Sequence, residues 1–137
     1  MARTALLDTG VLVALVNRSD PDHEPCREVW SKFRGELVTV EGVLVEACYL
    51  LRRAPGGVQA VVEMVNAVSA CFVGPSMSRF LRTAQLVEKY QDVPMDWVDG
   101  SLVAVAEELS VNEILTLDRR GFEVYRIKGK GRFALRP

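Results

Sequence analysis

The feature that most constrains this chain is an apolar run near its start that stops at an acid. Residues 4–7 end in two leucines, and Asp8-Thr9-Gly10 separates them from a second apolar run. A short, near-continuous apolar run is typical of a buried strand in a parallel sheet. Ligands of open α/β sheets bind at the carboxyl ends of the strands. Asp8 is therefore predicted either to cap the following helix or to belong to a site at that edge of the sheet.

Strand-like and helix-like patterns alternate along the rest of the chain. Strands are predicted over residues 4–7, 37–39, 70–73 and 114–117, with 123–126 as a candidate edge strand. Helices are predicted over residues 10–16, 23–33, 41–53, 58–69, 76–90 and 97–109. This alternation predicts an α/β fold in which helices flank a central, mostly parallel sheet of four or five strands. Neither an internal repeat nor a long linker divides the 137 residues, so we expect one domain over 1–137.

The charge is distributed unevenly between the body of the chain and its end. Residues 1–118 carry 10 Lys/Arg against 17 Asp/Glu, whereas residues 119–137 carry 7 against 1. A basic tail of this kind, over about 127–137, is a candidate contact for phosphate groups. A solvated, partly disordered end and a docking strand for a protein partner are the alternative interpretations.

Several other classes of site are disfavoured by the residues present. The three cysteines form no CxxC pair, which argues against a zinc or redox motif and favours a reducing, cytoplasmic setting. Asp8 interrupts the first apolar run too early for a signal peptide, and no stretch reaches the length of a membrane span. The single histidine, His23, lies at a predicted helix start, which excludes a Ser-His-Asp triad. Neither GxGxxG nor a P-loop motif occurs.

Carboxylates are therefore the main candidates for chemistry. Asp118 follows a second apolar strand as Asp8 follows the first, and parallel strands would place both acids at the same edge of the sheet. Glu46 has no basic neighbour three or four residues away on its predicted helix. Burial of an unpaired carboxylate is costly, so Glu46 is predicted to face a metal or a pocket, unless its side of the helix meets solvent.

Two further acids and two hydroxyls extend this set. Asp96 and Asp99 stand three residues apart at a helix start and resemble a capping box, which does not prevent them from presenting a carboxylate to a site. Thr9 and Thr116 lie beside the two strand-end acids, where each hydroxyl can orient a carboxylate, orient a metal-bound water or cap a helix. Convergent oxygens without imidazole or thiolate favour a hard cation, Mg²⁺ or Mn²⁺.

Four segments that carry these residues, in this order, resemble the PIN domain family. They are Leu6–Leu15, Glu46–Leu51, Pro94–Ala104 and Ile114–Phe122. The resemblance is to the VapC-type toxins of bacterial and archaeal toxin–antitoxin pairs. One departure is Gly100, where the family often has alanine.

The resemblance implies which residues form the site. Asp8, Glu46, Asp99 and Asp118 would be the catalytic acids that hold Mg²⁺ or Mn²⁺. Asp96 would be an outer or second-metal acid, and the hydroxyls of Thr9 and Thr116 would support the ligands.

The resemblance also implies the activity and the partners. The expected activity is divalent-metal-dependent endonucleolytic cleavage of single-stranded RNA by an activated water molecule. The expected partners are a second copy of the chain and a small antitoxin protein. The basic residues expected to contact RNA phosphates are Arg52, Arg53, Arg119, Arg120 and the tail.

Three alternatives compete with a toxin nuclease. A PIN nuclease that serves RNA processing, rather than a toxin, would carry the same acids. A PIN module that binds RNA or a protein without cleavage would not need the complete acid set. A phospho-accepting domain similar to response regulators needs an acid at the end of its third strand, and that strand here ends Phe72-Val73-Gly74.

Overall fold

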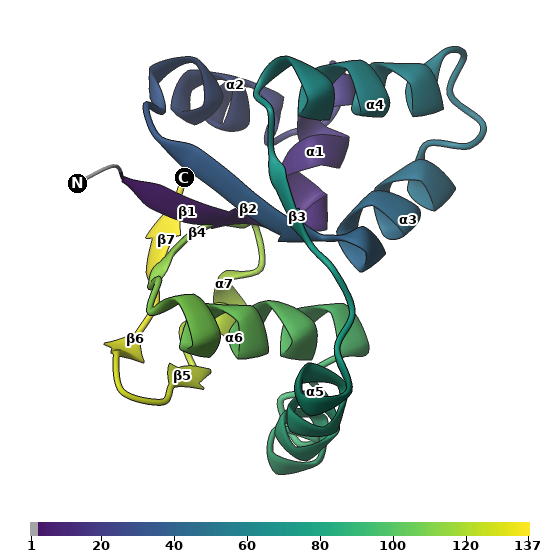
Figure 1. Ribbon diagram of the computed structural model, residues 1–137. Coiled ribbons are helices and arrows are strands. Elements are labelled where there is room, and N and C mark those ends of the chain that lie inside the picture. The colour runs from purple at the N-terminus through teal and green to yellow at the C-terminus, as the bar shows by residue number, and fades with distance from the viewer. Residues whose placement is uncertain (1–2) are drawn as a thin grey trace.

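The central sheet of the computed structural model has five strands in the order β3-β2-β1-β4-β7, and every neighbouring pair is parallel (Figure 1). The structure describes residues 3–137, so the first two residues of the predicted 1–137 domain lie outside it. The elements are β1 (Thr4–Leu7), α1 (Thr9–Val16), α2 (His23–Lys32), β2 (Glu36–Val40), α3 (Glu41–Leu50), α4 (Gly57–Ala67), β3 (Cys71–Val73), α5 (Met77–Lys89), α6 (Trp97–Leu109), β4 (Glu113–Leu115), α7 (Arg119–Phe122), β5 (Arg126–Ile127), β6 (Gly131–Arg132) and β7 (Ala134–Arg136). The predicted α/β class is confirmed.

Helices cover both faces of the sheet. Helices α1 to α4 lie on one side, and α5 and α6 lie on the other (Figure 1). Strands covered on both faces need apolar side chains in both directions, and Leu6 and Leu7 of β1 and Ile114 and Leu115 of β4 have no exposed surface. Within residues 3–137, no helix is both long enough and apolar enough to cross a membrane.

The register of β1 and β4 fixes the edge of the sheet that matters for function. Leu7 pairs with Leu115, so Asp8 and Thr116 follow the paired residues on adjacent strands. The backbone N–H of Asp8 donates a hydrogen bond of 3.0 Å to the carbonyl oxygen of Leu115, which extends the pairing by one residue. The predicted placement of the two strand ends at one edge is confirmed.

The predicted edge strand over 123–126 is wrong. The chain after β4 turns into the short helix α7, because the Asp118 carboxylate accepts a hydrogen bond of 3.0 Å from the backbone N–H of Gly121 and caps the helix. Only Arg126 of the predicted segment lies in a strand, β5, which pairs with β6 outside the main sheet.

The fifth strand comes instead from the predicted basic tail. Strand β7 pairs in parallel with β4, with Leu135 opposite Ile114. The Arg136 Nε lies 3.2 Å from Oε2 of Glu113, so an ion pair joins the two strands. A fully solvated tail is therefore the wrong interpretation for residues 134–136, which complete the sheet.

A glycine sets the distance between α5 and α6. A Cβ atom at Gly100 would lie 3.1 Å from methyl groups of Thr83 and Val87 and 3.2 Å from the sulfur of Met95. These distances are tighter than ordinary van der Waals contact, so the absence of a side chain lets α6 pack closely against α5. Helix α6 carries Asp99 in its first turn, and this packing fixes the position of that turn.

Candidate functional site

Asp8 is the most buried acid of the candidate site. Its side chain caps α1, with Oδ1 accepting a hydrogen bond of 2.8 Å from the backbone N–H of Thr9. Its other oxygen, Oδ2, accepts a hydrogen bond of 2.7 Å from the hydroxyl of Thr116. Asp8 is only 7% exposed. The predicted helix cap is therefore confirmed, and the same carboxylate lies buried at the carboxyl edge of the sheet.

The surroundings of Asp8 disfavour its negative charge. Burial raises the pKa of Asp8 to about 6, and the charges of Asp118 and Glu46 act in the same direction. The hydrogen bonds from Thr116 and Thr9 oppose this rise, because they stabilise the charged form. The influence of Asp118 and Glu46 on this group shows that acids from three separate segments of the chain converge on one region.

The threonine at the end of β4 links two of the acids. The Thr116 hydroxyl donates to Asp8 and accepts a hydrogen bond of 3.0 Å from the backbone N–H of Asp118. Thr116 is 1% exposed, so this link is shielded from water. The Thr9 hydroxyl is also buried but has no hydrogen-bond partner among residues 3–137, which leaves one uncompensated polar oxygen in the residue next to Asp8.

Asp96 and Asp99 form the predicted capping box at the start of α6. The backbone N–H of Asp99 donates a 2.8 Å hydrogen bond to Oδ1 of Asp96, and the reciprocal N–H lies 3.5 Å from Oδ2 of Asp99. Burial raises the pKa of Asp99 to about 8, and the charges of Asp96, Asp8 and Asp118 add to the rise. The helix start thus presents a half-buried carboxyl group to the same acidic region.

Glu46 lies on α3, on the side of the sheet opposite to α6 (Figure 1). It is half-buried on α3, and within residues 3–137 it forms neither an ion pair nor a side-chain hydrogen bond. Its charge nevertheless contributes to the raised pKa of Asp8. The structure therefore brings Asp8, Glu46, Asp99 and Asp118 towards one edge of the sheet, with Asp96 exposed at its margin.

The chain is similar to known proteins in sequence and in fold. A family model described as the PIN domain matches residues 5–128. The chain belongs to the PIN domain family. It is 30% identical over 135 residues to Ribonuclease VapC26 of Mycobacterium tuberculosis, covering 96% of this chain and 99% of that protein.

Solved structures share the fold of this PIN domain. VapC20 of Mycobacterium tuberculosis, described as a sarcin-ricin loop cleaving toxin, has a TM-score of 0.70 at 20% identity, covering 80% of this chain and 86% of that one. VapBC2 of Rickettsia felis, solved with a DNA fragment of its promoter, has a TM-score of 0.67 at 11% identity, covering 98% of this chain and 99% of that one.

One residue of the site was not predicted from the sequence. The Tyr125 hydroxyl donates a hydrogen bond of 3.3 Å to Oδ2 of Asp99, and the residue is 1% exposed. Its ring packs edge-on against Tyr90 and Phe122, with centroid distances of 5.1 Å in both pairs. Burial and the charge of Asp99 raise the pKa of Tyr125, so the hydroxyl remains a donor.

A glycine keeps this region open. A Cβ atom at Gly121 would lie 2.7 Å from Oδ2 of Asp118 and 2.8 Å from the Tyr125 hydroxyl oxygen. Both distances are shorter than real Cβ atoms allow, so only glycine fits between these two polar atoms without movement. The signal in the sequence was the spacing of Asp118 and Gly121 followed by two aromatic residues, Phe122 and Tyr125.

The side chains as placed do not enclose an ion. Among residues 3–137, no three Asp, Glu, His or Cys side chains lie close enough together to hold one metal. Three of the acids are instead engaged as helix caps, since Asp8, Asp96 and Asp118 each accept a hydrogen bond from a backbone N–H. The Asp118 cap uses Oδ1 alone, and Oδ2 of Asp118 accepts no hydrogen bond from the described residues.

The four arginines predicted to contact RNA are all exposed, but their contacts within the protein differ. The Arg52 guanidinium stacks on the ring of Tyr49 at 3.9 Å, and Arg53 is exposed beside it. Arg119 lies 3.6 Å from a carboxylate oxygen of Glu123 and donates to the carbonyl of the last residue, whereas Arg120 is exposed with no ion pair in the described structure.

Proposed function

We propose that this PIN domain is a divalent-metal-dependent endoribonuclease that cleaves single-stranded RNA, as the toxin of a VapBC-type pair. The observation that carries the proposal is the convergence of acids from four segments on the carboxyl edge of the sheet, with the pKa of Asp8 near 6 and that of Asp99 near 8. Acids that raise each other's pKa at a buried position indicate a site that lacks a positive charge. The near full-length similarity to a protein named as a ribonuclease supports nuclease activity.

The donor set fits Mg²⁺ or Mn²⁺. All of its members are carboxylate oxygens, which hard cations prefer, and the Thr9 hydroxyl next to Asp8 in the sequence is buried without a hydrogen-bond partner among the described residues. Asp8, Glu46, Asp99 and Asp118 would hold the ion. When bound, such an ion supplies a positive charge that lowers the pKa of a bound water and stabilises the charge on the attacked phosphate.

The residues of the chain prepare the site for this charge. The hydrogen bonds from Thr9 and Thr116 fix the orientation of the Asp8 carboxylate, so little conformational entropy is lost when it engages a ligand. Asp99, with a pKa near 8, holds its proton through much of the neutral range and releases it when positive charge enters. In the present arrangement Asp99 accepts the reciprocal bond of the capping box and Asp118 caps α7, so each carboxylate would have to release or share these bonds to engage an ion.

Four exposed arginines are the candidates for contacts with the RNA backbone. We assign Arg52, Arg53, Arg119 and Arg120 to the RNA phosphates, since each is exposed. Arg53 and Arg120 have no ion pair in the described part of the chain, so their charges are available to a polyanion. Contacts of this kind position the strand without reading its sequence.

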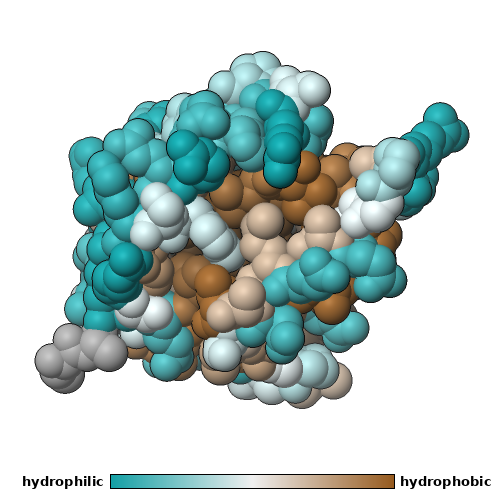
Figure 2. All heavy atoms as spheres, turned by 90° about the horizontal axis from the view of Figure 1, so that it is seen from above, coloured by the Kyte–Doolittle hydropathy of each residue, from teal (hydrophilic) through white to brown (hydrophobic). Residues whose placement is uncertain are grey.

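Exposed apolar residues on α3 and α4 form a candidate contact surface for protein partners. Helices α3 and α4 expose large apolar side chains, namely Val45, Tyr49, Leu50, Val58 and Val62. The face that carries α2 and α4 shows hydrophobic residues gathered at its centre and hydrophilic residues around them (Figure 2). Exposed apolar patches with polar rims mark protein contacts. A toxin–antitoxin complex from Klebsiella pneumoniae and the VapBC2 assembly have the same fold, which favours a small antitoxin as the occupant. We propose a second copy of the chain as the other partner.

The test is cleavage of single-stranded RNA by the purified chain. We expect fragments with Mg²⁺ or Mn²⁺, none with excess EDTA, and recovery when the ion is restored. The same assay on the chain purified with the small protein encoded beside it is expected to show inhibition. Cleavage that is insensitive to EDTA would contradict the metal site. RNA binding without any cleavage would favour the binding-only module.

Loss of one hydroxyl at Tyr125 tests the assignment of Asp99 to the metal. Tyr125→Phe keeps the packed ring but removes the donor that holds Oδ2 of Asp99. Groups that orient a metal ligand contribute about 10- to 100-fold to affinity, so we expect Mn²⁺ affinity to fall about 10-fold by calorimetry.

Tyr90→Phe is the matched control for that experiment. Tyr90 belongs to the same aromatic cluster, but its hydroxyl accepts a hydrogen bond from the backbone of Arg126 and does not contact an acid. We expect its Mn²⁺ affinity to match that of the wild type. Equal losses in both variants would show that the effect is structural and would remove Tyr125 from the site.

A further inference from the structure

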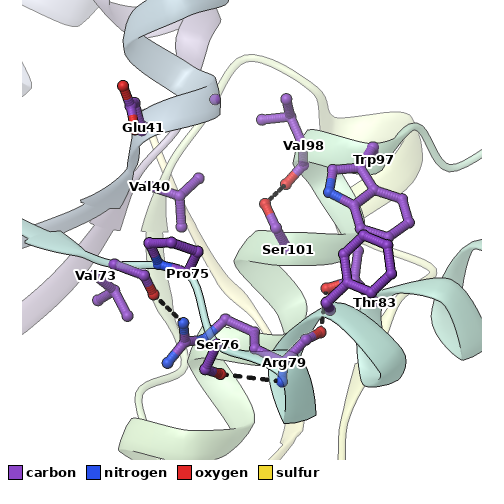
Figure 3. Close-up of a pocket in the computed structure, with 13 residues that line it drawn as sticks. Val40, Glu41, Val73, Pro75, Ser76, Arg79, Thr83, Trp97, Val98 and Ser101 are labelled. Atoms are coloured by element: carbon purple, nitrogen blue, oxygen red, sulfur yellow. Dashed lines mark hydrogen bonds between the residues drawn. The ribbon is translucent and has the colours of Figure 1, made fainter.

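A pocket of about 220 Å³ lies beside the acidic site, at the same edge of the sheet. Val40 and Val73, the last residues of β2 and β3, form its floor, and the first turns of α5 and α6 form its sides (Figure 3). Strand β2 lies between β3 and β1, whose end carries Asp8. Neighbouring strands are about 4.8 Å apart, so the pocket begins only about 5 to 10 Å from the strand that presents Asp8.

Two helices belong to both the pocket and the acidic site. Helix α3 lines the pocket with Gly42 and carries Glu46 one turn later, while α6 lines it with Val98 and carries Asp99 in the next position. The helices touch at this point, since a Cβ atom at Gly42 would lie 3.1 Å from a methyl group of Val98. A chain of RNA whose phosphate lies at the acids can therefore place a neighbouring group in the pocket.

Two aromatic rings form the wall of the pocket on the side of α5 and α6. The centroids of Phe80 and Trp97 lie 5.1 Å apart with an interplanar angle of 51°. The residues are 56% and 44% exposed, so part of each ring faces solvent. Base stacking on exposed aromatic rings is a main source of affinity in the binding of single-stranded nucleic acids.

The polar groups of the pocket suit an uncharged heteroaromatic ligand. The indole nitrogen of Trp97 lies on the side of its ring that faces Ser101 (Figure 3). The Ser101 hydroxyl donates to the Val98 carbonyl, so its oxygen remains able to accept. Arg79, the cationic residue of the lining, is paired with Glu108 at 2.8 Å, which disfavours a phosphate in this position. The lining also includes the exposed Glu41 carboxylate, which further disfavours a phosphate, and the hydroxyls of Ser76 and Thr83. A mostly apolar pocket with a few donors and acceptors in its lining matches a planar base with a polar edge.

We propose that this pocket binds a nucleobase of the RNA next to the cleaved phosphodiester, with the base stacked on Trp97 and Phe80. The proposal rests on the proposed function for the identity of the ligand, but it concerns a different set of residues. It assigns to the chain a subsite that reads or stabilises one base, whereas the arginines contact only phosphates.

The experiment uses Trp97 as its own reporter. In the full chain with Asp8→Asn and Trp30→Phe, Trp97 is the single tryptophan, because the sequence has two. The probes are short single-stranded RNA oligonucleotides and the same oligonucleotides with one abasic position, moved along the strand. We expect quenching of Trp97 fluorescence by the complete RNA and loss of quenching when one particular base is missing.

The matched variants are Trp97→Leu and Leu109→Ala. Trp97→Leu is expected to weaken binding of the complete RNA by about 5- to 100-fold and to leave binding of the abasic RNA unchanged. Leu109, at the other end of α6, is 46% exposed and serves as the control, with no change expected.

Two results would overturn the proposal. One is equal affinity of all abasic oligonucleotides together with unchanged binding by Trp97→Leu. The other is a change from dimer to monomer in Trp97→Leu without any change in RNA binding, which would assign the pocket to a protein contact. Cleavage without position-dependent quenching would leave the proposed function intact, and quenching in a chain that never cleaves would leave the base site intact.

Discussion

Replacement of Asp8 by asparagine is expected to lower the rate of RNA cleavage by at least about 1,000-fold without loss of the fold. A metal ion contributes several kcal/mol to the stabilisation of charge in the transition state, and each 1.36 kcal/mol corresponds to a factor of ten in rate. Asparagine removes the negative charge that would hold the ion. It retains an oxygen to accept the N–H of Thr9, and asparagine is as good a helix cap as aspartate.

Asp8→Asn is also expected to change the stability of the protein, and this effect separates the role of Asp8 in catalysis from its role in folding. Without divalent ions at pH 8, Asp8→Asn should be more stable than the wild type, because a buried charge has been removed. The rise of the Asp8 pKa from 3.8 to about 6 corresponds to about 3 kcal/mol. Urea unfolding in EDTA measures this difference.

Asp92→Asn is the control for this variant. Asp92 is an exposed acid in the loop before α6, and no hydrogen bond or ion pair of the described structure involves it. We expect wild-type cleavage and wild-type stability. An Asp8→Asn protein that cleaves RNA as fast as the wild type, or that is unfolded, would contradict the role assigned to Asp8.

The sequence predicted the strand-end acids because local pattern and topology agree there. Residues 4–7 and the segment before Asp118 are apolar runs without alternation, and such runs are buried in parallel sheets. Once the strands are parallel, their carboxyl ends meet at one edge whatever the strand order. Local patterns do not encode the strand order β3-β2-β1-β4-β7, which makes β1 and β4 neighbours. The direct hydrogen bond from Thr116 to Asp8 depends on this order and could not be predicted.

The errors of the sequence interpretation lie in the last 20 residues, where long-range contacts outweigh local pattern. Val124 and Tyr125 read as a strand, yet the cap formed by Asp118 turns the chain into α7 and carries the tyrosine hydroxyl to Asp99. Leu135 lies between Arg132 and Arg136 in the sequence, so the segment reads as a basic tail. Its pairing with β4 spans about 20 residues, and a local window does not detect such a contact.

The metal-free protein is expected to lose stability as the pH rises from about 5 to 8. The pKa of Asp8 is raised to about 6 and that of Asp99 to about 8, so the folded chain binds these protons more tightly than the unfolded chain. For groups with raised pKa, the stabilisation is complete below the unfolded-state pKa and disappears as the pH passes through the folded-state values. Glu113 has the opposite effect on stability, because its ion pair with Arg3 lowers its pKa. The stability that it contributes is lost as the pH falls below about 4.5.

Divalent ions should reverse this loss, and the size of the reversal should depend on pH. At pH 8 the acids are charged and Mg²⁺ or Mn²⁺ replaces the missing positive charge, whereas at pH 5 protons already neutralise Asp8 and Asp99. We therefore expect a larger rise in Tm on ion addition at pH 8 than at pH 5. Thermal unfolding at pH 5, 6, 7 and 8, in EDTA and in an excess of either ion, measures both effects.

Two variants assign this pH dependence to individual acids. Asp8→Asn should remove its part of the loss between about pH 4 and 6, and Asp99→Asn its part between about pH 4 and 8, because each window runs from the unfolded-state pKa of 3.8 to the folded-state pKa. Both should reduce the ion-induced rise in Tm at pH 8. Stability in EDTA that increases steadily from pH 5 to 8 would contradict the raised pKa values and, with them, the argument that these acids lie together to receive a cation.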